Sequence, residues 1–312
     1  MDEPRQAVPC VRGTEQVDPT PSVVTIGNFD GVHRGHQVLL RRTVDGATAR
    51  GLRSVAVTFD PHPVALLRPE LAPPLLQTLD ERCRQLRAAG ADLVLVLPFT
   101  RELAALTPAA FVERVLAGPL QARRVVVGTN FRFGNRAAGD VVTLVQEGEE
   151  HGFEVEAVTL LELGGVPISS SAVREHLQAG DVGWARLALG RAPRIAGTVV
   201  RGDARGRAIG FPTANLDVPD GLVLPADGVY AGHVELAGVR HPAVVNVGVR
   251  PTFDGQRRTV EAHLLDLDLD LYGRQLALDL EHRIRGERRF DGVEALVAQI
   301  TADAARSREL LT

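Results

Sequence analysis

Two histidines and three glycines stand where an apolar segment gives way to a run with helical spacing. These residues, 27–36 of the 312-residue chain, read GNFDGVHRGH. Free backbone N–H groups at a helix start, together with the helix dipole, favour an anion there. Gly31 and Gly35 let the backbone approach a ligand, and His33 and His36 can donate hydrogen bonds to phosphate oxygens. The turn therefore predicts a site for a phosphate-containing group.

Three further loops carry polar or aromatic side chains. They are residues 59–63 (FDPHP), 128–134 (GTNFRFG) and 168–174 (ISSSAVR). The last loop puts hydroxyls at an expected helix start with Arg174 one turn later, which is typical of a second anion site. Structural explanations also exist, because serines often cap helices and phenylalanines often pack in cores. One His-x-x-His without further ligands does not indicate zinc. The joint placement of these loops and the histidine turn favours the functional interpretation over the structural one.

The first half of the chain alternates strand and helix patterns. We expect strands at residues 23–26, 53–59, 93–97, 124–127 and 154–158, and helices at residues 36–50, 78–90, 108–116 and 140–151. This alternation is typical of an α/β doubly wound parallel sheet, a Rossmann-like fold whose ligands bind beyond the carboxyl ends of the strands. The loops after the strands are therefore expected to converge on one site.

From residue 194 the pattern changes to short β runs separated by turn residues. The runs are residues 195–200, 229–236, 243–247, 260–265 and 276–280, and they predict a small antiparallel barrel. An amphipathic helix over about residues 293–311 would cover one side. A short helix at residues 181–189 and a hinge at residues 190–193 precede the barrel. We predict two domains, residues 1–187 and 188–312.

The second half of the chain has its own group of candidate binding and catalytic residues. Residues 202–215, GDARGRAIGFPTAN, form a glycine-rich loop that ends on Thr213 and Asn215, oxygen donors suited to Mg²⁺ carrying a nucleotide phosphate. Glu261 is bracketed by apolar residues and is a candidate general base, although spacing alone does not prove it. For the later acids Asp268 and Asp270 we favour a solvated hairpin edge.

Composition excludes several classes of protein. The chain contains no lysine, so its 35 basic residues are all arginine, which rules out a P-loop and lysine Schiff-base chemistry. A net charge of −4 argues against a general nucleic-acid or membrane-surface binder. The two cysteines fit neither a disulfide framework nor a thiolate metal site. Without a signal-peptide pattern or a bilayer-spanning run, we expect a cytoplasmic protein.

The motifs together resemble the bacterial bifunctional riboflavin kinase/FMN adenylyltransferases, the prokaryotic FAD synthetases. The resemblance runs from about residue 23 to residue 311. Residues 27–36 match that family's form of the nucleotidyltransferase His-x-Gly-His signature. Its other adenylyltransferase motifs follow in order at residues 59–63, 130–134 and 168–174. Residues 210–216 (GFPTANL) resemble the riboflavin kinase signature, followed by residues 246–248, 250–253, Glu261 and residues 272–273.

The resemblance implies two ATP-dependent reactions. The C-terminal module would phosphorylate riboflavin to FMN, and the N-terminal module would transfer AMP from a second ATP to FMN, giving FAD and pyrophosphate. Mg²⁺ is the expected cofactor, the partners are small-molecule substrates without nucleic acid or membrane, and a homo-oligomer is left open. Two alternatives are an adenylyltransferase of another phosphate substrate, against which the barrel argues, and a flavin-binding regulatory protein without turnover, against which the intact catalytic groups argue.

The resemblance also implies roles for individual residues. Glu261 would accept the proton of the ribityl 5′-hydroxyl, Thr213 and Asn215 would hold Mg²⁺, and His33 and His36 would stabilise the charge of departing pyrophosphate. The expected ATP and phosphate contacts are Gly27, Asn28, Phe29, Gly31, Gly35, Ser169, Ser170, Ser171, Arg174, Gly202, Gly206, Gly210, Pro212, Thr213 and Asn215. The expected flavin contacts are Asp60, Asn130, Phe131 and Tyr272.

Overall fold

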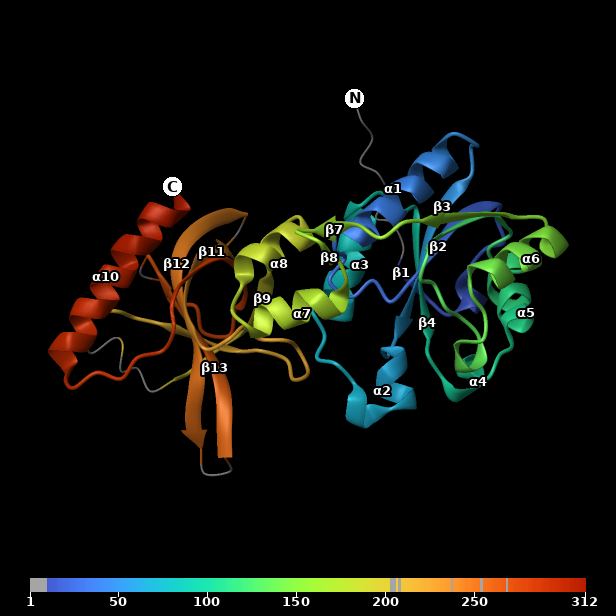
Figure 1. Cartoon of the computed structure of the whole chain (residues 1–312). Coiled ribbons are helices and arrows are strands. Elements are labelled where there is room, and N and C mark those ends of the chain that lie inside the picture. Colours follow the sequence, from blue (N-terminus) through green and yellow to red (C-terminus); the bar gives the residue numbers. More distant parts are fainter. Residues whose placement is uncertain (1–9, 203–205, 207–208, 237, 253–254, 268) are drawn as a thin grey trace. The chain divides into compact units, whose positions relative to one another are not determined.

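The chain forms two compact units in a computed structural model (Figure 1). The first contains the residues up to Pro73 and Thr78–Ser169, and the second contains Pro74–Gln77 and Ser170–Thr312. The structure describes residues 10–202, 206, 209–236, 238–252, 255–267 and 269–312, with the backbone alone for 250–252 and 255–257. Of the sequence interpretations above, Phe253, Asp268 and residues 203–205 and 207–208 of the glycine-rich loop lie outside the described residues. The predicted domain division after residue 187 stays a prediction.

A six-stranded parallel sheet forms the centre of the first unit. Its strands are β1 (Cys10–Arg12), β2 (Ser22–Ile26), β3 (Arg53–Asp60), β4 (Leu93–Pro98), β5 (Ala122–Gly128) and β6 (Glu154–Val158), in the order β1-β4-β3-β2-β5-β6. The chain builds outward from β2 through β3 to β4 and later returns to add β5 on the other side of β2. Ligands of open α/β sheets bind at such a switch point. The doubly wound sheet is confirmed, and β1 is an edge strand that the sequence pattern missed.

Helices cover both faces of this sheet. They are α1 (Arg34–Thr48), α2 (Pro63–Leu67), α3 (Leu79–Ala88), α4 (Arg101–Ala104), α5 (Pro108–Phe111) and α6 (Val141–His151); short 3₁₀ turns occupy Thr14–Gln16, Pro69–Leu71 and Asn135–Ala137, and a small hairpin joins β7 (Glu162–Leu163) to β8 (Val166–Pro167). One sheet face packs against Phe111 and Leu144, and the other packs against Leu40 and Leu86. Strand residues alternate between these two cores because successive side chains point to opposite faces. The expected helix at 108–116 is α5 continued by a π-helical segment, Val112–Ala117.

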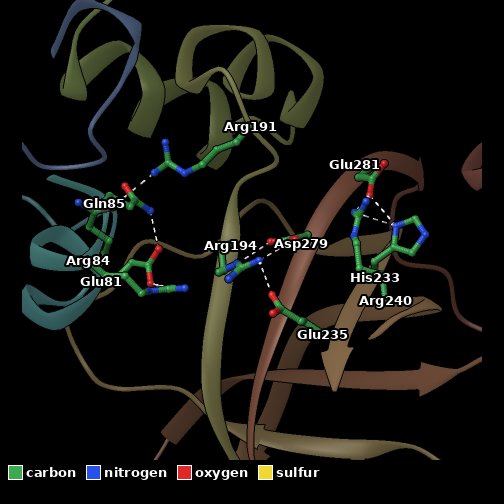
Figure 2. A network of polar contacts seen from close by, with 11 residues as sticks. Glu81, Arg84, Gln85, Arg191, Arg194, His233, Glu235, Arg240, Asp279 and Glu281 are labelled. Carbon is green, nitrogen blue, oxygen red and sulfur yellow. Dashed lines mark hydrogen bonds and ion pairs between the residues drawn. The ribbon is translucent and has the colours of Figure 1, made fainter. Parts of the chain in front are cut away.

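A closed antiparallel barrel forms the second unit, as the sequence predicts. Its strands are β9 (Arg194–Val200), β10 (Ala214–Asp217), β11 (Gly228–Leu236), β12 (Val239–Thr252), β13 (Gly255–Leu264) and β14 (Gln275–Arg285), in the order β10-β13-β12-β11-β14-β9. Figure 2 shows Arg194 of β9 binding Asp279 of β14 and Glu235 of β11 on the barrel surface. The sequence pattern missed β10, because four residues are too few to establish an alternation.

The second unit also contains α7 (Ser170–Gln178), α8 (Val182–Leu189) and the expected C-terminal helix α10 (Val293–Leu311). The carbonyl of Leu177 in α7 accepts a 3.0 Å hydrogen bond from the N–H of Ala226. Helix α10 packs against β11, β12 and β14 (Figure 1), and its Asp303 forms an ion pair of 2.7 Å with Arg285 of β14. No helix within the described residues has both the length and the apolar character needed to cross a bilayer.

Candidate active sites

The turn between β2 and α1 has an unusual backbone. Phe29, Gly31 and Val32 have φ angles of 50°, 82° and 38°, in the left-handed region. Glycine adopts this region freely, whereas each non-glycine residue costs about 1–3 kcal/mol there. The side chains of Phe29 and Val32 are 0% and 2% exposed, so core packing holds the strained turn in place. With these backbone angles, the loop between β2 and α1 closes tightly just before the first helical turn of α1.

His33 and His36 lie together at the N-terminus of α1. His33 is the N-cap of the helix, and its Nδ1 atom accepts the backbone N–H of His36 at 3.4 Å. The two imidazole rings stack with centroids 3.6 Å apart. A Cβ atom on Gly35 would lie 3.1 Å from the His33 ring, which explains the glycine between them. Because Nδ1 of His33 is an acceptor, the proton of the neutral ring is on Nε2, where it can be donated to a ligand.

His36 is held neutral by its surroundings. Burial, then the neighbouring His33 and then Arg82 lower the pKa of His36 well below its ordinary value. Its ring also makes a T-shaped contact with the ring of Phe29, with centroids 5.1 Å apart. Neutral imidazole can donate one hydrogen bond to a phosphate oxygen but carries no fixed charge. Positive charge in this region therefore comes from arginine and the helix dipole.

The loop after β3 is tied to this turn. The Asn28 amide lies 3.3 Å from Nε2 of His62, and the hydroxyl of Thr58 donates to the Asn28 carbonyl at 3.0 Å. Asp60 forms a 2.9 Å ion pair with Arg12. The structure thus brings together the expected phosphate contacts Gly27, Asn28, Phe29, Gly31 and Gly35. It places Asp60 at the end of the adjacent strand β3.

The loop after β5 presents an aromatic pair. Phe131 and Phe133 stack with centroids 5.5 Å apart, and Phe133 is buried in the sheet core. Asn130 is exposed at the head of the loop, and a Cβ atom on Gly128 would approach its Oδ1 at 3.0 Å. Core packing therefore accounts for Phe133. The expected flavin contacts of Asn130 and Phe131 stay predictions.

The serine motif crosses from one unit to the other. Ile168 belongs to the first unit, and its carbonyl would lie 3.7 Å from a Cβ atom on Gly35. Ser170 begins α7, and Arg174 is 7% exposed with its Nε donating to the carbonyl of Pro74 at 2.7 Å. Ser170, Ser171 and Arg174 are described with the second unit, so their contribution to the phosphate site stays a prediction, as does that of Ser169.

A row of polar side chains crosses three strands of the barrel. Glu261 of β13 pairs in register with Asn215 of β10 on one side and with Asn246 of β12 on the other. The neighbours of Glu261 along the strand, Val260 and Ala262, are 1% and 0% exposed, so the carboxylate points to the opposite face. The Thr213 hydroxyl lies 3.4 Å from a carboxylate oxygen of Glu261. These groups form one cluster of oxygen and amide ligands.

Described glycines of the glycine-rich loop lie close to this cluster. Added Cβ atoms on Gly202 and Gly206 would collide with the Asn215 amide and the Phe211 carbonyl, so the loop backbone approaches too closely for a side chain. Gly210 turns the chain at φ 85°. His263 donates to the carbonyl of Pro212 at 2.8 Å and fixes the loop next to Thr213. The ring of Tyr272 is half exposed, with the guanidinium of Arg201 5.8 Å from its centre.

Sequence reasoning missed Arg82. This residue of α3 is 2% exposed, and its Nη1 donates to the Phe59 carbonyl at 2.9 Å and to Thr58 Oγ1 at 3.3 Å. A signal was present, since Leu79, Arg82 and Leu86 share one face of the helix at apolar spacing. An arginine on such a face is either exposed at the rim of the face or held in the core by specific partners.

Comparisons with known proteins agree with this division of sites. The family described as FAD synthetase matches residues 15–172, and the family described as riboflavin kinase matches residues 189–311. Bifunctional riboflavin kinase/FMN adenylyltransferases from Escherichia coli K12 and Pseudomonas fluorescens are 41% and 42% identical, each over 96% of this chain and 96% or 97% of the relative. The relative from Bacillus subtilis is 35% identical over 90% of both chains.

A solved structure has the same fold over nearly the whole chain. It is titled as a macrolide-efflux protein from Streptococcus pneumoniae, and it superposes with a TM-score of 0.89 at 33% identity. The match covers 96% of this chain and 98% of that one. Both family matches and the near full-length relatives lead to one conclusion: the chain belongs to the family of bifunctional riboflavin kinase/FMN adenylyltransferases.

Proposed function

We propose that this protein makes FAD from riboflavin in two steps, each of which consumes ATP. The second unit phosphorylates riboflavin to FMN, and the first unit transfers AMP from ATP to FMN with release of pyrophosphate. The main support for the proposal is that a chain of this family has two separate groups of candidate site residues, one in each unit. The Glu261 cluster fits the kinase step, and the histidine turn fits adenylyl transfer.

In the kinase step, Glu261 accepts the proton of the riboflavin 5′-hydroxyl as that oxygen attacks the γ-phosphorus of ATP. Thr213 and Asn215 hold Mg²⁺, which neutralises phosphate charge when bound. Their fit to a hard cation is supported by the Thr213 hydroxyl 3.4 Å from the Glu261 carboxylate and by the register pairing of Asn215 with Glu261. The loop of Gly202, Gly206 and Gly210 covers the phosphates.

In the adenylyl-transfer step the nucleophile is the FMN phosphate, which is already an anion and needs no general base. The protein must align this phosphate with the α-phosphorus of ATP and stabilise the charge on departing pyrophosphate. His33 and His36 donate hydrogen bonds, and the N-terminus of α1 adds its dipole. Ser169, Ser170, Ser171 and Arg174 supply further donors, and Asp60, Asn130 and Phe131 seat the flavin. Tyr272 contacts riboflavin in the other site.

We place the functional division at residues 1–187 and 188–312. Because ATP is a substrate of both steps, we also place the protein in the cytoplasm. Incubation of the full chain with riboflavin, ATP and Mg²⁺ tests the function. FMN followed by FAD is the expected result. Bound but unchanged riboflavin would instead indicate a flavin-binding regulator, and failure to convert supplied FMN would indicate another adenylyl acceptor.

A further inference from the structure

The guanidinium of Arg82 is buried at a cost that packing alone does not explain. Only 2% of the side chain is exposed, and its neighbours Cys83 and Leu86 belong to an apolar cluster with Phe29. Removing a charge from water costs several kcal/mol unless partners compensate. An apolar side chain at this position would complete the cluster without that cost. The charge therefore serves something beyond filling space.

Arg82 is the first link of a hydrogen-bond chain that ends at the histidine turn. Its Nη1 donates to the Phe59 carbonyl at 2.9 Å and to Thr58 Oγ1 at 3.3 Å. The same hydroxyl donates its proton to the carbonyl of Asn28 at 3.0 Å. A hydroxyl can accept one hydrogen bond while donating another, so both contacts are compatible. Helix α3 thereby fixes the end of β3 and the start of the turn.

Electrostatic interactions also link Arg82 to the histidine turn and to the end of β3. Burial lowers the pKa of Arg82, whereas Asp30 and Asp60 act in the opposite direction and stabilise the cation. Burial, then His33 and then Arg82 lower the pKa of His36. Asp30 is fully buried within the GNFDGVHRGH turn itself. Arg82 is thus a fixed cation among two carboxylates and two imidazoles.

We propose that Arg82 is a positioning residue of the adenylyl-transfer step, which holds the end of β3 and, through Thr58, the Asn28 carbonyl, so that His33 and His36 keep one geometry. The proposal rests on the function proposed above for the histidine turn. Arg82 acts through these neighbours and need not touch ATP. After burial and His33, the same guanidinium also contributes to the lowered pKa of His36.

Kinetics of Arg82→Lys, Arg82→Met and Thr58→Val test the proposal. We expect Arg82→Met to lower kcat for the conversion of FMN to FAD by about 10²-fold, comparable to the loss of one charge-stabilising group, with a smaller change in KM for ATP. Arg82→Lys restores part of the loss, because it keeps the charge and one donor. Combining Arg82→Met with Thr58→Val costs no more than Arg82→Met alone, since both interrupt one chain. Arg124→Met, in the remote ion pair with Glu156, is the matched control.

A readout other than rate separates positioning from packing. Loss of the Arg82 charge removes a repulsion from the His36 imidazolium, so the pKa of His36 measured by NMR rises in Arg82→Met and stays low in Arg82→Lys. Wild-type rates in Arg82→Met would overturn the proposal. So would a loss that Arg82→Lys does not restore and that leaves the His36 titration unchanged. If the wild-type protein itself makes no FAD from FMN, the proposed function fails, while the NMR titration still tests Arg82.

A second, independent observation concerns the two cysteines. Cys10 of β1 and Cys83 of α3 are 73 positions apart, and their Sγ atoms lie 2.6 Å from each other. Cys10 is exposed and Cys83 is buried. Sequence spacing does not predict their pairing, because neither belongs to a spaced cysteine motif. The fold nevertheless places the chain's two thiols in direct contact.

We infer that this pair is a modification site, at which a hydroperoxide converts the two thiols to an internal disulfide. The Cys10 thiolate attacks a peroxide oxygen, which forms a sulfenic acid and releases hydroxide that takes up a proton. The Cys83 sulfur then displaces the sulfenic oxygen as water, so two thiols and one hydrogen peroxide give one disulfide and two waters. Burial and the contact with Cys10 raise the pKa of Cys83 to about 12, so Cys10 reacts first.

Mass spectrometry of the full chain after hydrogen peroxide treatment tests this inference. The protein is denatured and alkylated before measurement. We expect the monomer to lose two hydrogen atoms, to accept no alkyl group, and to regain both thiols with dithiothreitol. Cys10→Ser retains one thiol and forms no internal disulfide. Two alkylated cysteines after oxidation, sulfenic or sulfinic acid at Cys10 without a disulfide, or covalent dimers would each overturn the inference.

Discussion

The carboxylate of Glu261 and the hydroxyl of Thr213 lie 3.4 Å apart, although 48 positions separate them in the chain. The contact depends on the pairing of β10 with β13, which places Asn215 opposite Glu261. The proposed general base thus lies on β13, and the two proposed cation ligands lie on β10 and at the residue just before it. Thr213, Asn215 and Glu261 all belong to the second unit.

Glu261→Gln should abolish riboflavin phosphorylation and spare adenylyl transfer. The amide keeps the size of the side chain but cannot accept the proton, so we expect a loss of about 10²–10⁴ in kcat. Conversion of supplied FMN to FAD should remain at the wild-type rate. Glu281→Gln, in strand β14 of the same barrel, is the control (Figure 2). Near wild-type FMN formation by Glu261→Gln would show that the assigned role is wrong.

Two substitutions at His33 should separate helix capping from catalysis. His33→Ala loses both the N-cap acceptor and the imidazole, whereas His33→Asn keeps an acceptor. We expect His33→Ala to be less stable than His33→Asn by about 1 kcal/mol. Both should lower FAD formation by about 10²-fold, with riboflavin phosphorylation unchanged. Wild-type FAD formation by His33→Asn would mean that the residue only caps the helix.

The low pKa of His36 predicts a pH dependence of stability. The unfolded chain takes up a proton as pH falls through about 6.5, while folded His36 stays neutral. The unfolded state then binds more protons, so the first unit loses stability as pH falls below about 6.5, until the folded pKa is reached. Hydrogen exchange of the α1 amides, corrected for intrinsic rates, measures this loss. It should be smaller in His36→Gln than in His282→Gln, and equal losses would contradict the prediction.

The second unit should work on its own. A fragment of residues 188–312 should fold and make FMN but no FAD. A fragment of residues 170–312 should do the same and melt at a higher temperature, because it keeps the Leu177 carbonyl bond to Ala226 and the Arg283 bond to the carbonyl of Ala179. Circular dichroism and an FMN assay compare the two. A folded 170–312 fragment that cannot phosphorylate riboflavin would mean that the kinase site borrows residues from the first unit.

Local patterns made much of the fold predictable. Glycines and histidines between an apolar strand and a helix mark the GNFDGVHRGH turn, and both ends of β6 agree with the sequence pattern. Contacts that depend on strand register were not predictable from spacing. The pairing of Asn246 with Glu261 and the meeting of Cys10 with Cys83 exist only because distant segments fold together. Arg82 was missed because a buried arginine and a surface arginine look alike in an amphipathic pattern.

The central claim is that one chain carries two independent active sites, and mixing two inactive variants tests it most directly. Glu261→Gln and His36→Ala are each given riboflavin, ATP and Mg²⁺. Alone, Glu261→Gln should release no FMN or FAD, and His36→Ala should release FMN without FAD. Mixed in one tube, they should produce FAD, because FMN released by one variant is adenylylated by the other. Absence of FAD in the mixture, while Glu261→Gln still converts supplied FMN and His36→Ala still makes it, would contradict the account.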